Sequence, residues 1–85
     1  MTDKYKILKA LSNEHRFKIV ELLNQGERAV WGLLIDVKVS PQIISKHLSI
    51  LKDAGIVDSE KSGTEVFYKL KTETLVFMGK WFIQF

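Results

Sequence analysis

Apolar residues recur every three or four positions in the first half of the chain, which is the spacing of one face of an α-helix. The pattern predicts a helix over residues 3–11, a second that Ser12 or Asn13 caps and that ends near Gln25 and Gly26, and a third over residues 30–37. The second helix is the most apolar of the three, so we expect it at the centre of the core. Gly32 lowers the helix propensity of the third.

A fourth helix is predicted between Ser40 and Gly55, because this stretch has both a start and a stop signal. The Ser40 hydroxyl can accept hydrogen bonds from free backbone amides, and Pro41 suits the first helical position. Gly55 can adopt the left-handed conformation that closes a helix. One side of this helix is expected to face the core and carries Ile44, His47, Leu48 and Leu51. The other side is small and polar and carries Gln42, Ser45, Lys46, Ser49 and Asp53.

This polar side suits close approach to another surface, because surface helices usually carry longer charged side chains. We interpret it as a face that enters a DNA groove. Two helices joined by three or four residues, the second with an exposed polar face, form the helix-turn-helix pattern.

The apolar period changes from 3.6 to 2 after Gly55, which predicts a β-hairpin with its turn at Ser62-Gly63. Thr72 opens a last helix in which nearly every residue is apolar, and such a helix is buried almost all round. The predicted fold class is therefore mostly α with a small β-hairpin (α+β), in the order α-α-α-α-β-β-α. No linker or repeat divides the chain, so residues 1–85 are expected to form a single domain.

Length and composition limit the class of protein. A chain of 85 residues buries a modest share of its surface, so a second copy is expected to complete the core. The 46% of hydrophobic residues exclude a disordered segment, and no apolar run reaches the roughly 18 residues that cross a bilayer. The net charge of +3 is compatible with a polyanionic partner.

The sequence has no cysteine, which excludes a disulfide framework, a thiolate metal site and a cysteine nucleophile. It has no signal peptide, and a cytoplasmic location is expected. There is no Ser-His-Asp grouping, no glycine-rich phosphate loop and no pair of carboxylates on one predicted face, so the protein is not expected to be an enzyme.

Four blocks of sequence, in this order and at these intervals, resemble the successive signatures of the ArsR-type winged-helix transcriptional repressors. They are residues 8–16, 19–23, 39–48 and 51–57, and the resemblance runs over about residues 6–70. It implies a winged helix-turn-helix fold in which the helix of residues 41–54 enters the major groove of double-stranded DNA. It also implies that the hairpin is a wing over the flanking backbone and that the first and last helices, residues 3–11 and 72–85, form a homodimer.

Carried onto this sequence, the resemblance implies two sets of DNA-binding residues. Those of the recognition helix are Ser40, Pro41, Gln42, Ile43, Ser45, Lys46 and Ser49. Gln42 can pair with adenine and Lys46 with guanine or a phosphate, whereas Ile43 can equally contact a thymine methyl or pack against the third helix. The residues expected on phosphates, in the wing and the turn before the recognition helix, are Lys38, Lys61, Lys69 and Lys71.

The predicted dimer interface is apolar. Its residues are Ile7, Leu75, Phe77, Met78, Trp81, Phe82 and Phe85. Each large apolar side chain that becomes fully buried contributes about 1.5–3 kcal/mol, which makes an uncovered last helix unfavourable in water. Two other interpretations of this helix remain, a lid on the chain's own core and an anchor lying in the plane of a membrane.

The sequence departs from the family pattern at the metal sites. Classical metal-sensing members carry a Cys-x-Cys pair where this chain has Ala29 and Trp31, and the last helix holds no Asp or His, only Glu73 at its first turn. His15 and His47 lie far apart in sequence and are interpreted as packing residues. No metal and no cofactor are therefore expected. The family's usual glycine between the two motif helices is Lys38 here, which leaves the geometry of that turn open.

We therefore predict a sequence-specific DNA-binding regulator, a homodimeric repressor that reads an inverted repeat, with DNA and itself as partners and no membrane. Two alternatives remain open. One is a winged-helix module that uses the same surface for a protein partner. The other is a ligand-responsive regulator whose pocket lies at the last helix and includes Trp31 and Trp81.

Overall fold

Four helices and a three-stranded sheet make up residues 4–73, which are the residues that the computed structural model describes. The helices are α1 (Lys4–Leu11), α2 (Glu14–Asn24), α3 (Val30–Asp36) and α4 (Pro41–Asp53). The strands are β1 (Arg28–Ala29), β2 (Val57–Ser62) and β3 (Glu65–Leu70). The predicted order of four helices and a hairpin is confirmed, with β1 as an addition. The predicted last helix falls mainly on residues 74–85, outside the described residues.

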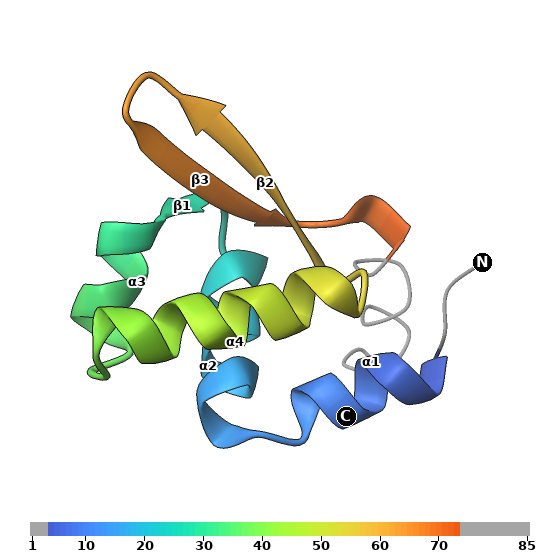
Figure 1. Ribbon diagram of the computed structural model, residues 1–85. Coiled ribbons are helices and arrows are strands. Elements are labelled where there is room, and N and C mark those ends of the chain that lie inside the picture. Colours follow the sequence, from blue (N-terminus) through green and yellow to red (C-terminus); the bar gives the residue numbers. More distant parts are fainter. Residues whose placement is uncertain (1–3, 74–85) are drawn as a thin grey trace.

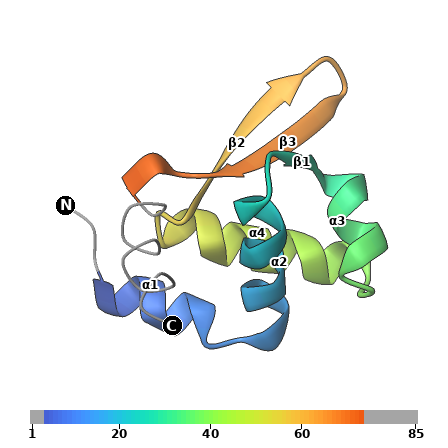
Figure 2. The ribbon, with the colours of Figure 1, turned by 180° about the vertical axis from the view of Figure 1, so that it is seen from behind.

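The core lies where α4 crosses α2, with α4 at the front in Figure 1 and α2 at the front in the view from behind in Figure 2. Ile19 and Val20 of α2 and Ile44, Leu48 and Leu51 of α4 are at most 2% exposed. The central position predicted for the second helix is therefore confirmed. No helix among residues 4–73 is long and apolar enough to cross a membrane.

Local signals in the sequence set both ends of α4. The Ser40 hydroxyl accepts a hydrogen bond from the Ile43 N–H at 3.3 Å, and Pro41 occupies the first turn. At the other end Gly55 has φ +76°, and the Ile56 N–H donates to the Leu51 carbonyl at 3.0 Å. This is a Schellman closure, in which the residue after the glycine packs against the last turn of the helix, and both Leu51 and Ile56 are fully buried.

The sheet has the order β1-β3-β2, and all its pairs are antiparallel. β1 was not predicted, because a two-residue strand gives no alternation to read. The hairpin turn is Gly63-Thr64 rather than the predicted Ser62-Gly63, since Ser62 pairs with Glu65. Gly63 has φ +64° and no non-glycine residue of the described chain has positive φ, which is the pattern of a type II′ turn with glycine in its first position.

The position of Ile7 corrects one prediction about the dimer interface. Its side chain is 0% exposed and belongs to the core of the single chain, so it has no surface left to offer a second copy. Ile7 and Ala10 instead attach α1 to the core. The exposed apolar side chains of α1 are Tyr5 at 75% and Leu8 at 40%.

Two glycines are expected to respond to alanine in opposite directions. Gly55→Ala places a Cβ in the left-handed region, so it should lower the free energy of unfolding by about 1–2 kcal/mol. Gly32 lies inside α3 with open space around the site of its missing Cβ, so Gly32→Ala should raise that free energy by about 0.5–1 kcal/mol. Urea unfolding of both variants measures the two changes, and equal effects would contradict the assignment of Gly55 as the helix stop.

Candidate nucleic-acid interface

The exposed side of α4 carries the polar residues that the sequence placed there. Gln42, Ser45, Lys46 and Ser49 are all exposed, and so are Ser40 and Pro41 at the start of the helix. They share one side because helical residues three, four and seven positions apart lie above one another. Ile43 is 44% exposed, so it lies at the edge of this side rather than in the core. We call the side formed by Gln42, Ser45, Lys46 and Ser49 the α4 polar face.

A four-residue turn, Val37 to Ser40, connects α3 to α4 and places Lys38 in solvent. Val37 is 4% exposed and caps α3 by donating its N–H to the Leu33 carbonyl. None of the non-glycine residues from 4 to 73 has positive φ, so Lys38 forms this turn without the left-handed conformation that glycine favours. The glycine of the family pattern is therefore not required by this backbone.

Arg16 connects α4 to the first two helices. Its Nε donates to the carbonyl of Ala10, near the end of α1, at 2.7 Å. Its Nη1 lies 3.3 Å from Nδ1 of His47, which then acts as the acceptor because a guanidinium can only donate. The rings of His47 and His15 have centroids 5.7 Å apart, so the structure brings together two histidines that are 32 positions apart in the sequence. The predicted packing role of His47 is confirmed, since the residue is 7% exposed.

The environment of His47 favours its neutral form. Burial lowers the pKa of His47 below the ordinary value of 6.5, and the positive charges of Arg16, His15 and Lys46 lower it further. A neutral ring can accept the hydrogen bond from Arg16, whereas a protonated ring cannot. The polar link between α2 and α4 therefore depends on His47 staying unprotonated.

Two further polar contacts hold the last turn of α4. Lys6 of α1 forms an ion pair with Asp53, with Nζ 3.1 Å from Oδ2. Lys52 Nζ donates to Ser59 Oγ of β2 at 2.7 Å. Sequence reasoning missed the role of Lys52, because nothing in a linear pattern shows that the chain after Gly55 turns back to bring Ser59 beside it.

The strand register separates the lysines of the predicted wing. Lys61 pairs with Val66 and Lys69 with Asp58, and these two pairs lie on opposite faces of the hairpin, since side chains alternate along each strand. Lys61 shares its face with Ser59, which contacts α4. Lys69 shares the other face with three acidic residues, Asp58, Glu60 and Glu65. Lys38 and Lys71 are exposed outside the strands, so the four lysines do not form one surface.

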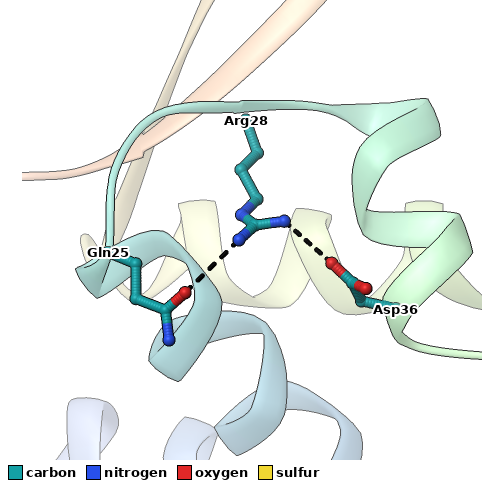
Figure 3. Close-up of polar contacts among 3 residues, drawn as sticks. All are labelled: Gln25, Arg28 and Asp36. Carbon is teal, nitrogen blue, oxygen red and sulfur yellow. Dashed lines mark hydrogen bonds and ion pairs between the residues drawn. The ribbon is translucent and has the colours of Figure 1, made fainter.

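Arg28, the first residue of β1, is held by contacts within the protein (Figure 3). Its Nη1 lies 2.8 Å from Asp36 Oδ2 of α3, and its Nη2 donates to the Gln25 side chain at 3.4 Å. These contacts join the end of α2 to α3 across β1. Arg28 therefore helps to fix the position of α3 relative to α2.

The surface of residues 4–73 has grooves but no cluster of metal ligands. No group of three or more His, Asp or Glu residues there is arranged to hold a metal ion. A surface groove of about 490 Å³ lies between β1 and α3 and includes Arg28, Trp31, Ile35 and Phe67. Trp31 is 60% exposed on this groove, whereas Trp81 lies outside the described residues.

The fold and the α4 polar face together define a winged helix-turn-helix domain, in which α3 and α4 are the two motif helices and β2 and β3 the wing. Residues 13–59 match the family model of the bacterial regulatory protein, arsR family. The chain belongs to this family.

Known relatives and solved structures agree with this assignment. The HTH-type transcriptional repressor SmtB of Mycobacterium tuberculosis is 42% identical over 65 residues, which are 76% of this chain and 48% of that protein. The transcriptional repressor SdpR of Bacillus subtilis is 32% identical over 93% of this chain and 88% of its own length. This chain thus spans about half the length of SmtB and most of SdpR.

The solved structure of the homodimeric winged helix-turn-helix DNA-binding domain of Mb0332 from Mycobacterium bovis is also similar. It superposes with a TM-score of 0.85 at 29% identity, over 93% of this chain and 74% of that chain.

The free energy of unfolding is expected to decrease as the pH is lowered, because His47 then becomes protonated. Because its pKa is lower in the folded chain than the 6.5 of the unfolded chain, the unfolded chain binds the proton more readily. The stabilisation is fully present above pH 6.5 and is lost as the pH falls below that value through the folded pKa. Thermal unfolding between pH 7.5 and 5.5 should show a falling midpoint for the natural protein.

The variant His47→Gln keeps a neutral acceptor and should flatten this pH dependence, whereas His15→Gln, at an exposed position, should keep most of it. A fall of equal size in the natural protein and in His47→Gln would contradict the role given to this histidine.

Proposed function

We propose that this chain is a homodimeric transcriptional repressor that binds double-stranded DNA in a sequence-specific manner, with α4 in the major groove. The single observation that carries the proposal is the α4 polar face, a side of small and amide-bearing residues on a helix that is capped at both ends and held by three neighbouring elements. An α-helix with its side chains is about 10–12 Å across, which matches the roughly 12 Å width of the major groove. The names of the relatives, transcriptional repressors in both cases, support the same function.

Base contacts are assigned to the first three turns of α4. Gln42 can form two hydrogen bonds with adenine, and Lys46 can donate to the acceptors of guanine. Ser45 and Ser49 are short enough to let the helix approach closely and can bond to base edges or phosphates. Ile43, at the edge of the face, suits contact with a thymine methyl group.

Contacts with the DNA backbone are assigned to exposed lysines beside α4. Lys38 precedes the helix, and Lys61 lies on the hairpin face that also carries Ser59, which contacts α4. Such contacts supply affinity that is independent of sequence and falls as salt is added. Lys69 is left out of this surface, because it lies on the other face opposite Asp58.

The proposed assembly is a homodimer. Its two α4 helices would lie about one DNA turn apart, roughly 34 Å, so the operator would be an inverted repeat. The exposed apolar side chains Tyr5 and Leu8 of α1 offer part of the interface. The remaining interface residues proposed from the sequence, from Leu75 to Phe85, lie outside the described residues. The homodimeric state of the Mb0332 domain supports this assembly.

Selection of bound fragments from random duplex DNA tests the function directly, and we expect a pseudo-palindromic site. The double variant Gln42→Ala, Lys46→Ala should lose its preference for that site by at least about tenfold, since one good pair of base contacts contributes about 1–3 kcal/mol of discrimination. Fluorescence anisotropy with the selected duplex and an unrelated duplex measures the ratio.

The matched control is Lys18→Ala, Asn24→Ala, which removes a lysine and an amide from exposed positions of α2 and should keep the preference. A preference retained in the α4 variant would show that another element reads the bases. Failure of the natural protein to bind any duplex at low salt would favour a protein partner for the same surface.

Substitution on α1 tests the dimer separately. In a two-fold dimer, Leu8→Glu places a charge in the apolar interface of both protomers. Analytical ultracentrifugation should therefore show the mass of a monomer. Ile35→Glu makes the same change at a residue that is 64% exposed on α3 and should leave the mass of a dimer. An unchanged dimer in Leu8→Glu would move the interface away from this side of α1.

A further inference from the structure

The exposed surface of α1 is divided into two chemically different sides. Ile7 and Ala10 point into the core. At 100° per residue, Leu8 lies on one flank of this buried line and Lys6 and Lys9 lie on the other, with Tyr5 opposite the buried line, between Leu8 and Lys9. The apolar flank is the one assigned to the dimer. The basic flank faces α4, as the ion pair between Lys6 and Asp53 shows.

The basic flank of α1 forms one wall of a groove beside α4. The groove has a volume of about 520 Å³, and its polar lining residues are Lys6, Lys9, Arg16, Ser49 and Asp53. It holds three cations and one carboxylate. Ser49 belongs both to this groove and to the α4 polar face, so the two surfaces are continuous.

The charges of this groove are arranged to leave it positive. Asp53 is the only carboxylate of α4, and it lies on the same side as Gln42, Lys46 and Ser49. Lys6 neutralises it at 3.1 Å. No carboxylate among residues 4–73 lies within ion-pair distance of Lys9, which is exposed.

The position of the groove fits a DNA strand. A helix that fills the major groove has one phosphate backbone along each of its sides. On one side of α4 lies the hairpin, joined to it through Lys52 and Ser59. On the other side lies α1, as both views show, with the hairpin above α4 and α1 below it (Figures 1 and 2).

We propose that the groove between α1 and α4 binds phosphates of the DNA strand on the side opposite the wing, with Lys9 as the phosphate contact and Lys6 as the group that masks Asp53. This inference rests on the proposed function of α4. It assigns to α1 a second role, because the same helix then offers its apolar flank to the partner copy and its basic flank to DNA.

The salt dependence of binding tests Lys9. Each phosphate contact contributes about 0.9 to the slope of the logarithm of the binding constant against the logarithm of salt concentration, so Lys9→Ala in a dimer should lower the slope by about 2. The ranking of duplex sequences should stay the same. The matched control is Lys69→Ala, which removes the same charge from the acidic face of the hairpin and should leave the slope unchanged.

The masking of Asp53 is tested by a pair of variants. Lys6→Ala exposes the carboxylate to the phosphates and should weaken binding at low salt, and adding Asp53→Asn to it should restore most of the loss. The mass in solution and the thermal midpoint are measured on the same samples, so that loss of the dimer or of the fold is detected.

Equal slopes for Lys9→Ala, Lys69→Ala and the natural protein would overturn this inference while leaving the selective binding through α4 in place. A weakened Lys9→Ala that no longer forms a dimer would also overturn it, because Lys9 would then belong to the interface between copies. Absence of duplex binding by the natural protein would instead remove the proposed function on which it rests.

Discussion

The burial of one side of α4 is the constraint on which the rest of this structure depends. Ile44, Leu48 and Leu51 are at most 2% exposed, and burying each side chain of this size contributes about 1.5–3 kcal/mol. Because the helical period places Gln42, Lys46 and Ser49 on the side opposite these buried positions, the three residues face solvent. The α4 polar face is therefore a geometric consequence of the core, and its residues are free to vary in chemistry without affecting the fold.

The polar contacts around α4 have a different role from the core. The ion pair of Lys6 with Asp53 is exposed on both sides, and such pairs contribute about 0–1 kcal/mol. Their effect is on orientation, since Lys6, Arg16 and Lys52 each connect α4 to a different element. The core determines which side of the helix is outside, and these contacts limit how it can tilt or slide.

Sequence reasoning succeeded where the signal is local. Ser40 and Gly55 each act on backbone groups within four residues, so the bounds of α4 could be read directly. It failed where the information depends on which distant segments meet. The contact of Arg16 with His47 spans 31 positions, and the partner of each hairpin residue follows from a register that shifts by two residues when the turn moves by one. The assignment of Ile7 to the dimer interface failed for the same reason. Its apolar spacing indicates that the side chain is buried, but not which surface buries it.

The net charge of +3 gives little indication of how suitable the surface is for a polyanion, because several acidic residues either lie away from the α4 polar face or are paired with a cation. Asp58, Glu60 and Glu65 lie together on the hairpin face opposite the one that contacts α4. Asp36 and Asp53 are each paired with a cation. The cations that border the α4 polar face thus act with few opposing charges nearby, and within about 10 Å, the screening length at 0.1 M salt, this local balance determines the field that a phosphate meets. A protein of small net charge can in this way present a locally positive surface beside α4.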